Sequence, residues 1–118
     1  MKILIDTNVV LDIILEREPF VEQAIELFEL IEQREVEGYI AATTITNVFY
    51  IVRKARGREV ALETIQRLLI GFQFCAVNRQ TVETALALGL KDFEDSVQLA
   101  CASNYQLDGV VTRNQKAL

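Results

Sequence analysis

Short hydrophobic runs alternate with longer amphipathic stretches along this chain of 118 residues. Four of the runs are short and apolar and predict buried strands, at residues 3–5, 39–41, 72–77 and 110–112; the first is also rich in β-branched residues. Gly38 breaks the pattern before the second run, and Asp108-Gly109 predicts a turn into the fourth. The strands should therefore be short and separated by long connections.

The connections carry apolar residues at helical spacing. They predict helices at residues 9–15, from Phe20 to about 33, at 59–70, at 81–90, and from about 91–92 onward. We expect Thr7 and Asn8 to cap the first of these helices, because short polar side chains accept hydrogen bonds from free N–H groups.

Residues 43–52 are ambiguous. Their β-branched and aromatic side chains favour a strand, whereas Ile45, Val48, Phe49 and Val52 follow the i, i+3, i+4, i+7 spacing of a helix. The basic residues that follow suit a helix end, so we predict a helix, with Thr43 or Thr44 as its cap.

This alternation of strands and helices predicts one α/β domain over residues 1–118. Strands joined by helices form a parallel sheet covered on both faces. The expected architecture is a three-layer α/β/α sandwich around four to five short parallel strands.

Composition agrees with a globular domain, since 51% of the residues are hydrophobic and 25% are charged. No apolar stretch approaches the length of a membrane span, and no signal peptide is recognisable, so we expect a cytoplasmic protein without membrane contact. Cys75 and Cys101 lie in apolar segments, which favours buried thiols over a disulfide.

The formal net charge of −5 argues against nucleic-acid binding through bulk positive charge. One local cluster is basic and comprises Arg53, Lys54, Arg56 and Arg58. It predicts either a small phosphate-facing patch or a solvated helix end, because cations also favour helix C-termini.

The chain contains no histidine, which excludes imidazole bases, histidine-containing triads and histidine-ligated zinc. Carboxylates, amides and hydroxyls remain, and these groups favour a site for a hard cation with oxygen ligands. Asp6 directly follows the first strand, where ligand sites of open α/β sheets lie. By itself, an aspartate there is also typical of a helix cap.

Four polar segments fall at the expected ends of strands or starts of helices. They lie within the stretches IDTNVVLD, TITNVFYIVRK, DFEDSVQLACA and VVTRN. In this order and at these separations, they resemble the PIN domain family, which includes ribonuclease domains like the VapC toxins and the PilT N-terminus, over essentially the whole chain. The resemblance implies an α/β/α fold whose acidic cluster holds Mg²⁺ or Mn²⁺ and cleaves RNA phosphodiester bonds.

The resemblance also implies roles for individual residues. Asp6 and Asp95 match two of the family's acids as catalytic metal ligands, and Asp92 is an additional ligand or electrostatic neighbour. The second and fourth acids of the family fall on Asn47 and Asn114, and asparagine offers a neutral oxygen but no charge. The residues expected to orient the ion, water or phosphate are Asn8, Asn47, Thr112 and Asn114.

Two functional hypotheses follow. The first is a ribonuclease toxin held inactive by a small antitoxin, with a homodimer as its expected assembly. The second is a weak or silent PIN-like module that binds RNA or a protein through the same cleft and the basic cluster. A phosphatase with an aspartyl nucleophile fits poorly, because Asn8 stands where a second aspartate would be expected.

Overall fold

The central element is a sheet of four parallel strands within residues 1–113, the part of the chain that the computed structural model describes. The strands are β1 (Lys2–Ile5), β2 (Glu37–Ala41), β3 (Gln73–Cys75) and β4 (Gly109–Val111), in the spatial order β3-β2-β1-β4. The parallel pairing of β1 with both β2 and β4 confirms the predicted sheet. The third strand is shorter than the predicted 72–77.

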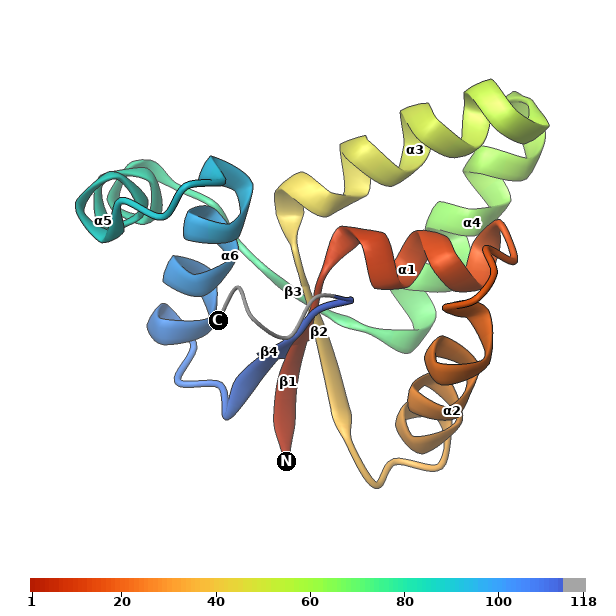
Figure 1. Cartoon of the computed structure of the whole chain (residues 1–118), viewed down its shortest axis with the longest axis horizontal. Helices are drawn as coiled ribbons and strands as arrows, with labels where there is room; N and C mark the ends of the chain where they lie inside the picture. The colour runs from red at the N-terminus through yellow and green to blue at the C-terminus, as the bar shows by residue number, and fades with distance from the viewer. Residues whose placement is uncertain (114–118) are drawn as a thin grey trace.

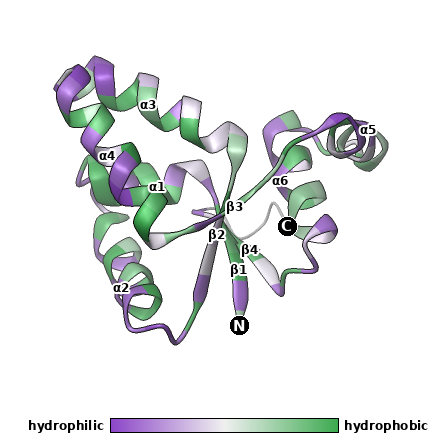
Figure 2. Cartoon of the chain, turned by 180° about the vertical axis from the view of Figure 1, so that it is seen from behind, coloured by the Kyte–Doolittle hydropathy of each residue, from purple (hydrophilic) through white to green (hydrophobic). Residues whose placement is uncertain are grey.

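Two helices lie in each connection between successive strands. They are α1 (Thr7–Ile14) and α2 (Val21–Glu32), then α3 (Ala42–Arg56) and α4 (Arg58–Gly71), then α5 (Arg79–Leu88) and α6 (Phe93–Asn104). The ambiguous segment 43–52 is therefore helical, as its spacing predicted. Figure 2 shows hydrophobic and hydrophilic residues alternating along α2 and α3, the pattern of helices with one buried face.

The helices cover both faces of the sheet, with α1 to α4 on one side and α5 and α6 on the other (Figure 1). Alternate residues of β1 supply the two cores: Ile3 and Ile5 pack with Val48 of α3, and Leu4 packs with Cys101 of α6. This confirms the three-layer α/β/α architecture. None of the helices in residues 1–113 is long and apolar enough to span a bilayer.

Gly38 lies inside β2, not before it as predicted. A Cβ atom at this position would lie 2.8 Å from ring atoms of Phe72 and 2.9 Å from Ile31. The glycine is therefore required by the close approach of these side chains to the strand.

The helix caps differ in part from those expected. Asp6 caps α1, which confirms the alternative reading of this residue, and neither Thr7 nor Asn8 does so. Helix α3 begins after Ala41 without a side-chain cap, so the prediction for Thr43 or Thr44 was wrong. Thr44 is buried, and its hydroxyl lies 2.9 Å from that of Thr7. The threonines thus join the starts of α1 and α3.

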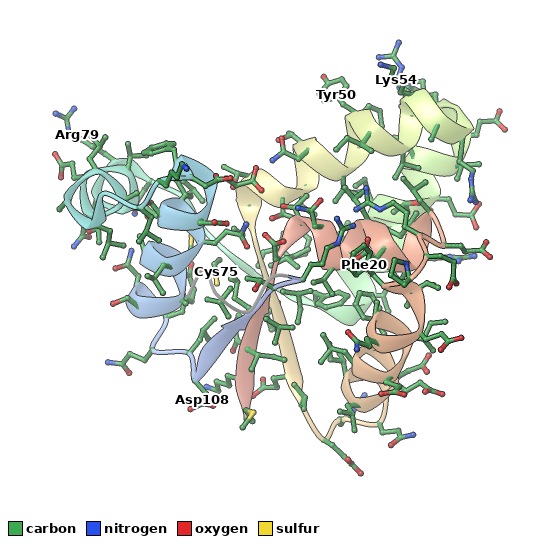
Figure 3. All side chains as sticks on the ribbon, in the orientation of Figure 1. Phe20, Tyr50, Lys54, Cys75, Arg79 and Asp108 are labelled. Carbon is green, nitrogen blue, oxygen red and sulfur yellow. The ribbon has the colours of Figure 1, made fainter. Side chains whose placement is uncertain are left out.

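Both cysteines are buried free thiols, as predicted. Burial, and secondarily the proximity of Cys101, raises the pKa of Cys75 to about 12. Figure 3 labels Cys75 at β3. These thiols act as small hydrophobic residues between the sheet and α6.

Candidate functional site

Asp6 lies between β1 and α1, at the carboxyl end of the sheet, and only 7% of its surface is exposed. Its backbone N–H donates to the carbonyl of Val111 in β4 (3.0 Å). One carboxylate oxygen, Oδ2, accepts from the backbone N–H of Asn8 (3.2 Å), and Oδ1 accepts from Nε2 of Gln98 (2.7 Å). The carboxylate is therefore fixed by neutral donors from two helices.

A second carboxylate, Glu94 of α6, lies beside Asp6. Gln98 Nε2 is 3.4 Å from Glu94 Oε1, and Asn47 Nδ2 of α3 donates to Glu94 Oε2 (3.0 Å). We call Asp6, Asn47, Glu94 and Gln98 the acidic cluster. It joins the N-cap of α1 to the first two turns of α3 and α6, and the starts of these helices converge above the strand ends in Figure 1.

Gln98 is the buried centre of the cluster, with 1% of its surface exposed. Its amide nitrogen serves both carboxylates, while its oxygen Oε1 is buried without a hydrogen-bond partner among the described residues. An unpaired buried acceptor costs about 1–3 kcal/mol. The two carboxylates therefore hold the amide in an orientation that is otherwise unfavourable.

Negative charge accumulates here without full compensation. Burial, and then the charge of Asp6, raises the pKa of Glu94; Asp92 and Asp95 act in the same direction, while a hydrogen bond from Thr7 opposes them. Burial, and then Asp92 and Asp6, raises the pKa of Asp95. Bound positive charge would relieve this repulsion.

Asp92 and Asp95 lie at the start of α6, as predicted, but they are placed differently. Asp92 is exposed and caps the helix, accepting from the backbone N–H groups of Glu94 (2.9 Å) and Asp95 (3.4 Å). Asp95 is half-buried next to the cluster. Within residues 1–113, no three acidic or cysteine side chains form a ready-made metal-binding group.

Sequence reasoning missed Glu94 and Gln98. A signal was present, because residues spaced i and i+4 on a helix share one face, and Glu94 and Gln98 have this spacing. The partnership of Glu94 with Asn47 had no such signal, since it joins two helices far apart in the sequence.

Asn8 is exposed next to the cluster and is held by Arg17. The guanidinium donates to the backbone carbonyl of Asn8 (3.2 Å) and, at 3.4 Å, to its side-chain oxygen. The Asn8 side-chain nitrogen is thereby oriented away from Arg17, as a donor on the rim of the site.

Arg17 also belongs to a second charged group, which we call the Asp12 ion cluster: Asp12, Arg17 and Arg113. Asp12 is 1% exposed, and its carboxylate accepts from Arg17 Nε (3.0 Å) and from Arg113 Nε (3.2 Å) and Nη2. The Arg113 guanidinium carbon lies 4.0 Å from the ring centre of Phe20. The hydrogen bond with Asp12 raises the pKa of Arg113. This cluster ties α1 to the segment after β4.

The predicted basic cluster lies elsewhere. Arg53, Lys54 and Arg56 are in the last turn of α3, Arg58 begins α4, and all four are exposed. At a rise of about 1.5 Å per residue, Arg53 lies about 9 Å along α3 from Asn47. Figure 3 shows Lys54 at the end of α3 that points away from α6. The residues of the basic cluster therefore do not belong to the acidic cluster.

Two further predicted residues follow β4. Thr112 is half-buried directly after the strand. Asn114 lies outside the described residues.

Comparison with known proteins adds a family and a set of similar folds. A family model described as the PIN domain matches residues 2–116. None of the curated proteins matches the chain in sequence.

Three solved structures have similar folds. VapC20 of Mycobacterium tuberculosis, a toxin that cleaves the sarcin-ricin loop, has a TM-score of 0.76 at 11% identity, covering 95% of this chain and 89% of its own. VapBC2 of Rickettsia felis, bound to a promoter DNA fragment, has a TM-score of 0.72 at 17% identity, covering 98% and 90%. A toxin-antitoxin complex of Klebsiella pneumoniae has a TM-score of 0.70 at 22% identity, covering 97% and 88%.

Proposed function

Because the chain belongs to the PIN domain family, we propose that it is a metal-dependent ribonuclease that hydrolyses RNA phosphodiester bonds. The observation that carries this proposal is the acidic cluster at the carboxyl end of the sheet, where the buried Asp6 and the half-buried Glu94 share neutral amide partners. A carboxylate whose pKa is raised by burial and by a neighbouring charge, as that of Glu94 is, is typical of functional sites.

The donor set fits Mg²⁺ or Mn²⁺. The cluster offers carboxylate and amide oxygens, and the chain has no histidine that would favour a softer metal. A divalent ion bound here would lower the pKa of a water molecule and offset the charge of the phosphate. Magnesium sites commonly use one or two protein carboxylates and complete their coordination with water and substrate phosphates, so a group of three is not required.

In this proposal Asp6 and Asp95 hold the ion, and Asp92 is an additional ligand or electrostatic neighbour. Asp6 is already fixed by Gln98 and by the Asn8 backbone, whereas Asp92 has one oxygen engaged in capping α6. Asn8, held by Arg17, would offer its side-chain N–H groups to a phosphate oxygen. Asn47, Thr112 and Asn114 would help to orient the ion, the water or the phosphate through their amide and hydroxyl groups.

The proposed biological setting is a toxin-antitoxin pair in the cytoplasm. The similar structures from Rickettsia felis and Klebsiella pneumoniae are a toxin-antitoxin pair and a toxin-antitoxin complex. By analogy, this chain would have a small antitoxin protein as its partner, and the toxin would form a homodimer.

A second candidate function is a catalytically weak or silent module that binds RNA or a protein partner at the acidic cluster. Its support is Asn47, whose amide occupies the position where the family resemblance places an acid. Such a module would bind RNA without cutting it.

Incubation of the purified protein with single-stranded RNA and Mn²⁺ separates the two candidates. We expect cleavage that Asp6→Asn lowers by about a hundredfold or more, because a metal ligand contributes several kcal/mol to transition-state stabilisation. Asparagine retains the helix cap, so the fold should persist. Glu26→Gln, on the exposed face of α2, is the matched control for net charge. RNA binding without cleavage would favour the silent module.

A further inference from the structure

We propose that Glu94 is a metal-binding residue of this site, and that it supplies from α6 the carboxylate that position 47 of α3 lacks. The inference rests on the proposed metal-dependent function. It adds a residue that neither the motif nor the family resemblance indicates, and it explains how a site with asparagine at position 47 retains its negative charge.

The contact between Asn47 and Glu94 is the first observation. Asn47 Nδ2 lies 3.0 Å from Glu94 Oε2, so the carboxylate of α6 reaches the side chain of α3 at which the expected acid is missing. An amide is the complementary neighbour for a carboxylate there, because two acids at this distance would repel each other. Glu94 of α6 thus places a carboxylate beside position 47 of α3, where the family resemblance leads us to expect an acid.

The second observation is the pairing of Glu94 with Asp6 through Gln98. A single amide nitrogen lies 2.7 Å from Asp6 Oδ1 and 3.4 Å from Glu94 Oε1. The N–H groups of this neutral amide present only partial positive charge, on their hydrogens, to the two carboxylates. The place that the amide nitrogen occupies is where positive charge is most favourable in the cluster.

The third observation is the unpartnered oxygen of Gln98. Oε1 is buried in a side chain that is 1% exposed, and it accepts no hydrogen bond from the described residues. Oε1 and Nε2 are bonded to the same carbon, so a rotation of the amide would exchange them and turn a neutral oxygen toward Asp6 and Glu94. A cation bound between the ionised carboxylates would favour that orientation, because the amide oxygen could then coordinate it.

Asp6 and Glu94 are two carboxylates, which is the number that a magnesium or manganese site commonly draws from the protein. Asp95 then adds negative charge from the edge of the cluster. Asp92 is the least suited of the acids of α6, because its Oδ1 already caps the helix.

Manganese binding tests the proposal directly. Titration calorimetry with MnCl₂ alone would compare the unmodified full chain with Glu94→Gln, with the exchange variant Asn47→Glu/Glu94→Gln, and with the charge control Glu26→Gln. We expect Glu94→Gln to weaken Mn²⁺ binding by about tenfold or more. The exchange variant should recover most of the affinity, since it returns the carboxylate to the same place from α3. Glu26→Gln should bind as the unmodified chain does.

The metal-induced rise of the melting temperature, measured on the same variants, must follow the same order. The assignment is overturned if Glu94→Gln binds Mn²⁺ as tightly as the unmodified chain, or if the exchange variant stays as weak as Glu94→Gln. Retained RNA cleavage with sensitivity to Asp6→Asn would then leave the proposed function standing. Absence of both Mn²⁺ binding and cleavage in the unmodified chain would overturn both proposals.

Discussion

Asp6 and Asp12 are both buried at helix α1, yet their charges are handled in opposite ways. Two arginines, Arg17 and Arg113, pair with Asp12. Among the described residues, the hydrogen-bond donors to the Asp6 carboxylate are neutral, the amide of Gln98 and the backbone of Asn8. A second carboxylate, Glu94, lies beside it. Arg113 acts on Asp6 through its charge, but it forms its ion pair with Asp12. A buried charge is tolerated when a partner compensates it, and it is available to a ligand when none does.

Asp12 therefore has a structural role, whereas Asp6 is available for the proposed metal ion. The Asp12 ion cluster connects α1 with the segment after β4, and its negative charge is satisfied inside the protein. The acidic cluster keeps its negative charge at the carboxyl end of the sheet, where open α/β folds bind their ligands. Removing the positive charge of the arginines should therefore destabilise the protein at the Asp12 ion cluster. Removing the negative charge of Glu94 should stabilise it at the acidic cluster.

The largest expected effect comes from removing the compensation of Asp12. The variant Arg17→Met/Arg113→Met would leave this carboxylate, with a side chain only 2% exposed, without a cation. We expect the free energy of unfolding to fall by about 3–5 kcal/mol. Urea denaturation measures the change.

A third substitution provides the control. Adding Asp12→Leu to that variant removes the uncompensated charge, so most of the lost stability should return. If the double variant were as stable as the unmodified chain, Asp12 would not depend on its arginines and the contrast with Asp6 would fail.

A smaller effect on the free energy of unfolding is expected when the pH is changed, through the titration of the acidic residues Glu94 and Asp95. The raised pKa values of Glu94 and Asp95 mean that the folded state holds these protons more tightly than the unfolded state does. Their contribution to stability is thus fully present below the ordinary carboxyl range and is lost as pH rises through the raised values.

Urea denaturation at a series of pH values, without divalent metal, measures this trend. The series should run from about pH 4, the ordinary carboxyl pKa, to about pH 7. We expect Glu94→Gln to be relatively more stable than the unmodified chain toward the upper end, because the repulsion with Asp6 is removed. Added Mn²⁺ should oppose the loss in the unmodified chain. A stability difference between the two proteins that does not change with pH would contradict the picture of an uncompensated cluster.

The sequence was informative wherever a local pattern decides the structure. The apolar run 3–5 followed by Asp6 predicted a strand ending at the site, and the spacing of Ile45, Val48, Phe49 and Val52 predicted α3 against its β-branched composition. These features depend on neighbours along the chain, where periodicity carries the information.

The missed features depend on side chains that meet only after folding. The bond from Asn47 to Glu94 joins α3 to α6, and the fit of Gly38 depends on Phe72 and Ile31 from other elements. At the start of α1 the sequence offers Asp6, Thr7 and Asn8 as capping residues, and it does not decide that Asp6 is the one that caps the helix. Distant packing, which no local pattern encodes, decided the first two, and competition between equivalent neighbours decided the third.

The basic cluster offers the smallest test, because its cations lie outside both charged groups. Arg53→Gln/Lys54→Gln removes two exposed charges at the end of α3 and should leave Mn²⁺ binding at the acidic cluster unchanged. If the cluster contacts RNA phosphates, binding of a single-stranded RNA weakens, and the slope of log K against log salt becomes shallower by about 1.4 for two lost contacts. Arg67→Gln/Arg79→Gln, which removes two exposed cations of α4 and α5, is the control with the same net charge (Figure 3 labels Arg79). Equal salt slopes for the two variants would identify the basic cluster as the solvated end of α3. Its cations would then interact only with the negative end of the helix dipole, which is a favourable contact.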